Sequence, residues 1–413
     1  MAVKRDHRIC FFFFFFFFFI FFVLSEVPPP AAPYLMFRAA IARSQASLPP
    51  PQTAARLTSL TRHISPAASP STGRMPLVTS TMVNSDKPRV ILGLMTFGPP
   101  GTESKGGRIT TLEEYNKNLD YFQSQGYNEV DTARGYIGGQ QEAFTREARW
   151  RDRGLTLATK CYPVKPGDHA PEKLRASLEK SLGELGSESV DIFYLHAPDR
   201  SVPFKDTLQC CDEMFKEGKF VQLGLSNFAA WEVAEVWNIA NERGWVKPTI
   251  YQAMYNAITR DIEKELVPCC RKYGIDLVVY NPLAGGVFSG KYKSKSDVPK
   301  EGRFADVANA GKMYRARYFQ DSTFDALQTI EPAVQKHGLT LIETALRWCV
   351  HHSALRFAKD GGNDGIIIGV SSLAQLESNL RDLEKGPLPQ EVVDALDLAW
   401  ETHFKAKGPT YWR

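Results

Sequence analysis

The feature that most constrains the fold is a regular alternation of short apolar runs and longer amphipathic segments from residue 89 onward. Eight runs have the composition of strands, and each is followed by helical spacing. The runs are RVILGLM (89–95), YNEVD (127–131), LTLATK (155–160), VDIFYLH (190–196), FVQLGLS (220–226), TIYQA (249–253), IDLVVYNP (275–282) and GIIIGV (365–370). This alternation predicts a parallel (β/α)8 TIM barrel of the α/β class.

Helices are expected near 111–126, 140–152, 171–185, 205–217, 230–243 and 261–273, with two helical patterns before the last run and one helix after it.

The alternative to the barrel is an open, doubly wound parallel sheet. Such a sheet usually carries a glycine-rich first turn of the form GxGxxG. The first run continues instead as GLMTFGPPG (93–101), which does not match. The barrel is therefore favoured.

The first 85 residues differ in composition from the remainder. An apolar run of 14 residues (11–24) follows three basic residues, as in a secretory signal, and is shorter than the ~20 residues of a spanning helix. Residues 27–85 contain arginine but no acidic residue, as in an organelle transit segment. A third interpretation is an upstream extension, with Met75 or Met82 as the true start. We treat 1–85 as a low-complexity, disordered or targeting-like extension and 86–413 as the barrel domain. We expect a cytoplasmic protein, with secretory or mitochondrial targeting left open.

Charge and cysteine content narrow the class of protein. The whole chain has 50 basic and 46 acidic residues, and residues 1–85 hold eight of the basic and two of the acidic ones. The remaining chain therefore holds 42 basic and 44 acidic residues. A nearly neutral body argues against a nucleic-acid surface. The seven cysteines show no metal-ligand spacing, so we expect no metal, and their odd number fits a reducing compartment.

Polar and ionisable residues fall at the ends of successive strand-like runs. They are Asp131, Lys160, His196, Ser226, Asn227, Gln252 and Tyr280. Each alone has an ordinary explanation, such as a helix cap for the aspartate or a solvated surface position for the lysine. TIM-barrel active sites, however, lie at the carboxyl ends of the strands. The succession therefore predicts a site at that face.

Tyr136 follows Asp131 by five residues and completes a chemically coherent set. A tyrosine with a free pKa near 10 donates a proton more readily if an ammonium group lowers that pKa. A partly buried lysine in turn needs a carboxylate partner. We therefore expect Asp131 to hold Lys160, Lys160 to tune Tyr136, and His196 to donate a hydrogen bond to a substrate carbonyl. This set supplies no hydride, so a reduction would require a nicotinamide cofactor.

Several ordered motifs resemble the aldo-keto reductase superfamily, in its aflatoxin-aldehyde and succinic-semialdehyde reductase branch. They are DTARGYIGGQQE (131–142), LATK (157–160), DIFYLHAPD (191–199), GLSNF (224–228), YQAMYN (251–256), VVYNPLAGGVFSGKY (278–292) and GVSSLAQLESNL (369–380). The resemblance runs from about residue 89 to residue 413. It implies NADPH-dependent reduction of aldehydes, and of some ketones, to alcohols on a (β/α)8 barrel.

The resemblance also implies roles for individual residues. The catalytic tetrad would be Asp131, Tyr136, Lys160 and His196, with Tyr136 as the proton donor. The cofactor would contact Asp131, Ser226, Asn227, Gln252, Tyr280, Asn281, Pro282, Leu283, Gly285, Gly286, Lys291, Arg303, Gly369, Ser371, Ser372, Gln375 and Asn379. Within this set the carboxamide of the cofactor would bind Ser226, Asn227 and Gln252, and the nicotinamide ring would stack on Tyr280. The adenosine phosphate end of the cofactor would bind within residues 369–379. The substrate would contact Tyr136 and His196. A substrate carboxylate would contact Arg413, because the C-terminal tail (403–413) closes over the substrate pocket in this branch.

Two alternatives stay open. The motif SSLAQLESNL (371–380) is also typical of a helix capped by Ser371 or Ser372. Many relatives have Lys or Arg where this motif has serines, so the sequence leaves the preference for NADPH or NADH open. The same fold also serves as a cofactor-sensing regulatory β subunit of membrane channels. The expected partners are a small carbonyl substrate and a second copy in a homodimer, with no nucleic acid and no membrane contact for the barrel.

Overall fold

The computed structural model describes residues 87–413 except 301 and 306–308. The apolar run at 11–24, the targeting-like composition of 27–85 and the boundary at 85/86 lie outside the described residues.

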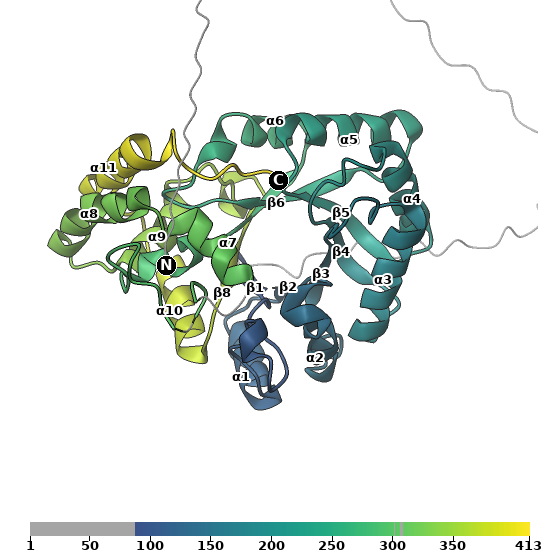
Figure 1. The fold of residues 1–413 in the computed structure, drawn as a ribbon, viewed down its shortest axis with the longest axis horizontal. Coiled ribbons are helices and arrows are strands. Elements are labelled where there is room, and N and C mark those ends of the chain that lie inside the picture. Colours follow the sequence, from purple (N-terminus) through teal and green to yellow (C-terminus); the bar gives the residue numbers. More distant parts are fainter. Residues whose placement is uncertain (1–86, 301, 306–308) are drawn as a thin grey trace, which may run out of the picture. The chain divides into compact units, whose positions relative to one another are not determined.

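Eight parallel strands close into a barrel in sequence order (Figure 1). They are β1 (Arg89–Gly93), β2 (Glu129–Asp131), β3 (Thr156–Cys161), β4 (Val190–Leu195), β5 (Phe220–Ser226), β6 (Pro248–Met254), β7 (Asp276–Tyr280) and β8 (Gly365–Gly369). Closure is made by β1 and β8, which pair in parallel from Arg89↔Gly365 to Gly93↔Gly369. The (β/α)8 prediction is thus confirmed, and the open doubly wound sheet is excluded because its edge strands would be unpaired.

Helices alternate with these strands, as expected. The first six are α1 (Leu112–Ser124), α2 (Gln141–Glu147), α3 (Pro171–Leu185), α4 (Phe204–Lys216), α5 (Ala230–Arg243) and α6 (Leu266–Tyr273). Local signals set their ends: the Thr111 side chain accepts a hydrogen bond from the backbone N–H of Glu114 at the start of α1. Similarly, α3 begins with Pro171 and ends before Gly186, which has φ 65°.

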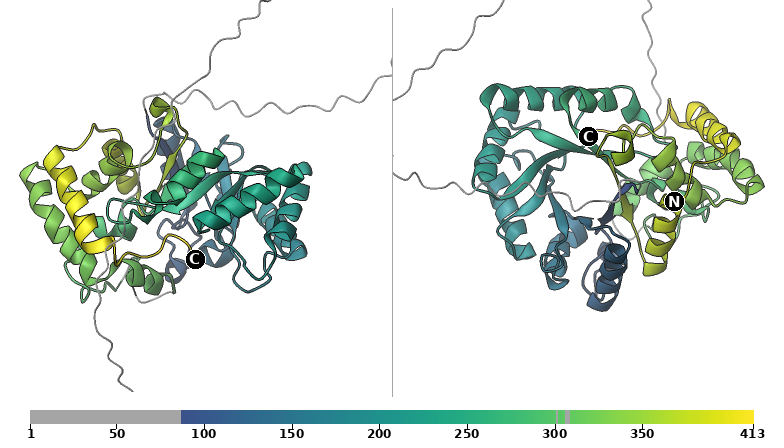
Figure 2. Two further views of the ribbon diagram at one scale, coloured as in Figure 1. Left: turned by 90° about the horizontal axis from the view of Figure 1, so that it is seen from above. Right: turned by 180° about the vertical axis from the view of Figure 1, so that it is seen from behind.

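The connection between β7 and β8 differs from the expectation of two helices. It contains the short helix η4 (Ala284–Ser289), then α7 (Asn309–Tyr318), α8 (Asp321–Lys336) and α9 (Leu341–His351). The sequence pattern misses α7 because this helix is largely polar and directs only a few aromatic side chains, such as Tyr314 and Tyr318, inward. After β8 come α10 (Leu373–Leu383) and α11 (Gln390–Ala399), where one helix was expected. Figure 2 shows α11 lying alongside α8.

Side chains fill the barrel interior, so no channel runs through it. The interior cluster consists of Ile91, Ala158, Ile192, Tyr194, Ile250, Val278 and Ile367. Gly224 of β5 makes room for the largest of these, since a Cβ atom at residue 224 would lie 2.4 Å from the ring of Tyr194. The filled interior leaves the carboxyl face of the strands to form a site. Among the helices that the structure describes, none combines the length and apolarity that crossing a membrane requires.

Candidate active site

The carboxyl ends of the strands and the loops that follow them enclose a cavity of ≈ 430 Å³. Asp131 is the last residue of β2, Lys160 lies one residue before the end of β3, and His196 directly follows β4. Tyr136 begins the short helix η2 (Tyr136–Gly139) in the loop after β2. Three of these side chains line the cavity, and Lys160 lies behind them, so the structure brings the four together.

Lys160 connects the other members of this group. Its Nζ donates to Asp131 Oδ1 at 2.5 Å and to the backbone oxygen of Thr132 at 2.6 Å, and it lies 3.3 Å from the hydroxyl of Tyr136. The second carboxylate oxygen of Asp131 accepts a hydrogen bond from Gln252 Nε2 at 2.8 Å. Burial raises the pKa of Asp131 and lowers the pKa of Lys160, and their ion pair opposes both shifts. The lysine is thus held with its three donors directed at three oxygen atoms.

The pKa of Tyr136 departs from the expectation of a lowered value. Burial raises this pKa well above its usual value, and the negative charge of Asp131 raises it further. Burial and Asp131 thus outweigh the lowering that is expected from the nearby Lys160 ammonium. The consequence is a phenol that keeps its proton at neutral pH, which is the protonation state that a general acid requires.

The backbone beyond Tyr136 is held in a conformation that is rare for its residues. Ile137 has φ 51°, a left-handed value that is unusual for a β-branched residue, and Gly138 and Gly139 continue it at 63° and 86°. The Arg134 guanidinium closes the loop by binding the Gly139 backbone oxygen and the Glu142 carboxylate. That carboxylate, which is buried, also accepts from Thr159 Oγ1 of β3 at 2.6 Å. The network ties the loop that carries Tyr136 to the strand that carries Lys160.

His196 is a neutral imidazole at the cavity wall. Burial lowers its pKa well below the usual value, and the positive charge of Lys160 lowers it further. Its ring meets Tyr136 and Tyr162 edge-on, at centroid distances of 6.3 and 5.4 Å. Its Nδ1 has no hydrogen-bond partner within the described part of the chain. A buried polar atom without a partner is uncommon in native proteins.

The predicted carboxamide contacts form a second hydrogen-bonded group. Asn227, at φ 60°, donates from Nδ2 to the His196 backbone oxygen at 2.7 Å and to Ser226 Oγ at 3.0 Å, and accepts from the Tyr280 hydroxyl at 3.1 Å. Asn227, Gln252 and Tyr280 line the cavity, whereas Ser226 is fully buried behind Asn227. The amide nitrogen of Gln252 is already engaged with Asp131. The Asn227 amide oxygen accepts one side-chain hydrogen bond and keeps a second lone pair for a ligand.

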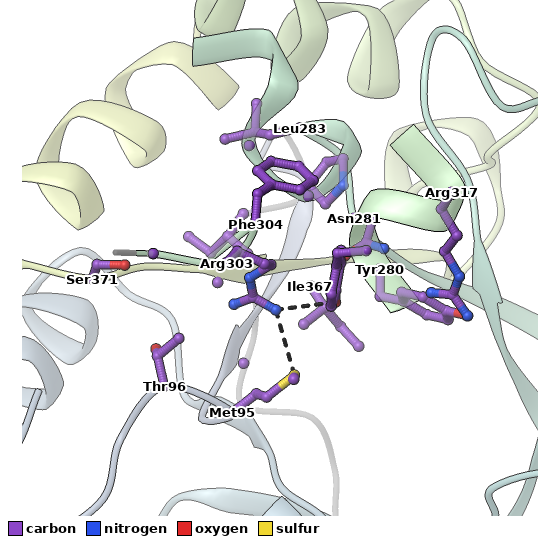
Figure 3. A pocket seen from close by; sticks show the side chains of 18 of the residues that line it. Met95, Thr96, Tyr280, Asn281, Leu283, Arg303, Phe304, Arg317, Ile367 and Ser371 are labelled. Atoms are coloured by element: carbon purple, nitrogen blue, oxygen red, sulfur yellow. Dashed lines mark hydrogen bonds between the residues drawn. The ribbon is translucent and has the colours of Figure 1, made fainter. Parts of the chain in front are cut away.

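The remaining predicted cofactor contacts lie along one side of the cavity. Those that line it are Asn281, Pro282, Leu283, Gly285, Gly286, Lys291, Arg303, Gly369, Ser371, Gln375 and Asn379. Figure 3 shows Arg303 extending into the middle of the pocket, where its Nη1 lies 3.5 Å from the Met95 sulfur and 3.0 Å from the Tyr314 hydroxyl. Ser372 is the exception: it caps α10, accepting from the Gln375 backbone N–H at 3.4 Å. The helix-cap interpretation therefore holds for Ser372.

The cavity is also lined by Arg413 and by several residues that the sequence did not predict. Arg413 lines the cavity, and its guanidinium lies 3.5 Å from the Met313 sulfur. The unpredicted residues include Met95, Thr96, Tyr162, Phe304, Met313, Tyr314, Arg317, Ile342 and Ile367. Most come from the loops after β1, β3 and β7, whose paths no periodic pattern reveals. Arg317 and Arg303 both lie over the ring of Tyr314, at 5.9 and 4.9 Å from its centroid.

Comparison with known proteins decides the family. Residues 89–401 match the family model described as the aldo/keto reductase family. The chain belongs to the aldo/keto reductase family. The human aldo-keto reductase family 7 member A3 is 40% identical over 346 residues, which cover 81% of this chain and 100% of the relative. The mouse aflatoxin B1 aldehyde reductase member 2 is 40% identical over 79% of this chain and 88% of its own length. An aldo-keto reductase of the fungus Pseudocercospora fijiensis is 45% identical over 68% of this chain and 96% of its own length.

Membership of the aldo/keto reductase family confirms the resemblance inferred from the motifs and makes this protein an oxidoreductase that acts on small carbonyl compounds. The family uses a nicotinamide cofactor, NADH or NADPH. Within the described residues, no group of three or more His, Cys, Asp or Glu side chains is arranged to hold a metal ion.

Proposed function

We propose that this aldo/keto reductase reduces aldehydes, and some ketones, to alcohols with NADPH, and that Tyr136 is the general acid. The observation that carries the proposal is the position of Lys160, whose Nζ contacts both the Asp131 carboxylate and the Tyr136 hydroxyl at the wall of a ≈ 430 Å³ cavity. Cavities of several hundred Å³ are typical of small-molecule sites.

The proton would pass from the Tyr136 hydroxyl to the carbonyl oxygen of the substrate. Because its pKa is raised, the phenol enters the reaction protonated. Lys160, at 3.3 Å, would stabilise the phenolate that remains, and Asp131 would keep the lysine charged. The neutral His196 would orient the carbonyl oxygen by a hydrogen bond. Asp131 and Lys160 thus act through Tyr136 and not on the substrate itself.

The residues present fit a nicotinamide dinucleotide. Tyr280 offers an aromatic face at the cavity, and Asn227 offers an amide oxygen with a free lone pair. Lys291 and Arg303 place positive charge along the side that ends at Ser371, near the start of α10, where the N-terminal backbone N–H groups favour phosphate. When bound, the nicotinamide supplies the hydride.

The substrate end favours anions. Asp131 is the one acidic side chain among the described residues that line the cavity, and it is neutralised by Lys160, whereas Arg317 and Arg413 also line it. We therefore propose that aldehydes bearing a carboxylate, such as succinic semialdehyde, bind with the carboxylate at Arg413. The names of two relatives as aflatoxin B1 aldehyde reductases support an aldehyde as the reacting group. The homodimer and the cytoplasmic location stay predictions.

Oxidation of NADPH, followed at 340 nm with a panel of aldehydes and compared with NADH, tests the proposal. We expect turnover of 4-nitrobenzaldehyde and of succinic semialdehyde with NADPH. The variant Tyr136→Phe should lose roughly 10²–10⁴-fold in kcat, the usual contribution of a general acid, and should still bind NADPH. Tyr162→Phe is the matched control, because Tyr162 lines the same cavity and its ring also meets His196. Retained activity in Tyr136→Phe would show that another group donates the proton.

A further inference from the structure

The C-terminal tail brings the last residue of the chain to the pocket. The segment 405–413 leaves the helical turn η6 (Trp400–Phe404) beyond α11 and crosses the molecule to end over the barrel (Figure 1). Arg413 is exposed yet lines the cavity. Chain ends fray unless contacts tie them down. The contacts that hold this tail therefore decide where the guanidinium of Arg413 lies.

Tyr411 is the buried contact of the tail, with 6% of its surface exposed. Its hydroxyl accepts a hydrogen bond from the backbone N–H of Ala230 at 3.0 Å and donates one to Glu265 Oε1 at 2.5 Å. Ala230 is the first residue of α5, and Glu265 immediately precedes α6. The phenol thus satisfies one of the N–H groups that a helix start leaves free, and it links two helices to the tail. Burial, reinforced by Glu265, raises the pKa of Tyr411, so it remains a donor.

The tail also contacts the rest of the protein through Arg413 and Trp412, and the Arg413 guanidinium lies 3.5 Å from the Met313 sulfur. The backbone N–H of Arg413 donates to the Asn227 backbone oxygen at 3.0 Å. The Arg200 guanidinium lies 5.5 Å from the ring centroid of Trp412, whose exposed fraction is 40%. Exposed cation–π contacts are weak, and Arg200 is already paired with Glu232 at 2.7 Å. Removing the Tyr411 hydroxyl should therefore release the tail even though these contacts of Arg413 and Trp412 remain.

We propose that Tyr411 is a positioning residue that fastens the tail to α5 and α6, holds Arg413 at the pocket, and so sets a preference for aldehydes that carry a carboxylate. This inference rests on the proposed substrate role of Arg413. It goes beyond that role because it assigns the selectivity to a hydroxyl group that does not touch the substrate.

The variant Tyr411→Phe tests the proposal with two independent measurements on the full chain. Carboxypeptidase B removes a C-terminal arginine, and mass spectrometry follows the release of Arg413. We expect release to be about 10-fold faster in Tyr411→Phe, the effect of losing a hydrogen bond to a charged group. The KM for succinic semialdehyde should rise by about 10-fold, while kcat and KM for the neutral 4-nitrobenzaldehyde stay within about twofold.

Tyr127→Phe is the matched control. Tyr127 is also nearly buried, at 5% exposed, and its hydroxyl donates to Glu384 at 3.1 Å, but it precedes β2 at the opposite face of the barrel. It should leave both the release of Arg413 and the KM unchanged. Arg413→Gln serves as the reference for complete loss of the guanidinium and should raise the KM for succinic semialdehyde at least as much as Tyr411→Phe does.

Three results would contradict the inference, and each would contradict a different step of it. Release of Arg413 from Tyr411→Phe at the wild-type rate would overturn the anchor. If Tyr411→Phe releases Arg413 faster but keeps the wild-type KM for succinic semialdehyde, the anchor does not determine selectivity. If Arg413→Gln also keeps the wild-type KM, the proposed role of Arg413 is wrong. Absence of NADPH oxidation with every aldehyde would refute the proposed function. The rate of Arg413 release would still test whether Tyr411 fastens the tail.

Discussion

At the scale of single residues, two opposing influences act on Tyr136. The Lys160 ammonium at 3.3 Å favours the phenolate, whereas burial and the Asp131 carboxylate favour the protonated phenol and prevail. A phenol that is firmly protonated suits reduction, in which it gives up a proton only as charge develops on the substrate oxygen. The lysine then contributes most after the proton has moved, when a negative charge lies beside it.

This balance predicts how reduction depends on pH. A raised pKa keeps Tyr136 protonated at every pH below it, and activity falls only as pH rises through that value. His196, whose pKa is lowered, stays neutral until the solution becomes acidic. We therefore expect kcat for 4-nitrobenzaldehyde reduction with NADPH to stay constant within about twofold from about pH 6.5 to about pH 9. Stopped-flow measurement of the reduction step checks this, and a decline centred near neutral pH would contradict it.

The sequence predicted the residues at strand ends better than their protonation. Asp131, Lys160 and His196 could be located because a strand end is readable from an apolar run that stops at a polar residue. The sign of the Tyr136 shift could not be read, because it depends on how completely surrounding loops exclude water. The same limit hid Tyr314 and Arg317, which reach the cavity from a polar helix far along the chain.

At the scale of elements, the loop from β2 to α2 depends on one buried ion pair. Glu142 is 1% exposed and binds both Arg134 and Thr159, so the conformation of residues 137–139 is set by a side chain on the helix that follows. Glu142→Gln keeps the size of the side chain and removes its charge. It should destabilise the protein by about 3 kcal/mol, because Arg134 loses its partner at a partly buried position.

The same substitution should lower kcat by roughly tenfold, since a phenol that is less firmly held spends less time in reach of the carbonyl oxygen. Guanidinium denaturation and aldehyde reduction measure the two effects. Glu147→Gln, at an exposed position of the same helix, is the control and should change stability by less than about 0.5 kcal/mol. Loss of stability with wild-type kcat would mean that the loop holds Tyr136 without help from Glu142.

Among the elements, those with a clear apolar period were predicted closely, and those without it were not. The ranges 171–185 and 230–243 coincide with α3 and α5, which have a buried stripe. The stretch between β7 and β8 was underestimated by one helix because α7 is held by aromatic contacts within the pocket wall instead of by an apolar stripe. Its role in lining the cavity thus made it harder to recognise from the sequence.

At the scale of the whole molecule, closure of the barrel depends on β1. This strand pairs with both β2 and β8, and Arg89 forms an ion pair with Glu129 at 2.6 Å and donates to the Asn363 backbone oxygen at 2.8 Å. A barrel without one strand exposes two unpaired edges. The family match likewise begins at residue 89, the first residue of β1. These observations make β1, which begins at residue 89, indispensable to the barrel.

Two truncated chains test this limit. A chain of residues 82–413 keeps β1 and every described contact, so we expect its melting temperature to stay within about 2 °C of the full-length value, with unchanged kcat for 4-nitrobenzaldehyde. A chain of residues 94–413 lacks only twelve further residues but loses β1, and with it one of the two partners of β2 and one of the two partners of β8. It should show no cooperative melting in circular dichroism and no NADPH oxidation, because the unpaired strands cannot close around the interior cluster. A clearly lower melting temperature for 82–413 would mean that residues before 82 contribute to the stability of the barrel. Cooperative melting of 94–413 would mean that seven strands can support the fold.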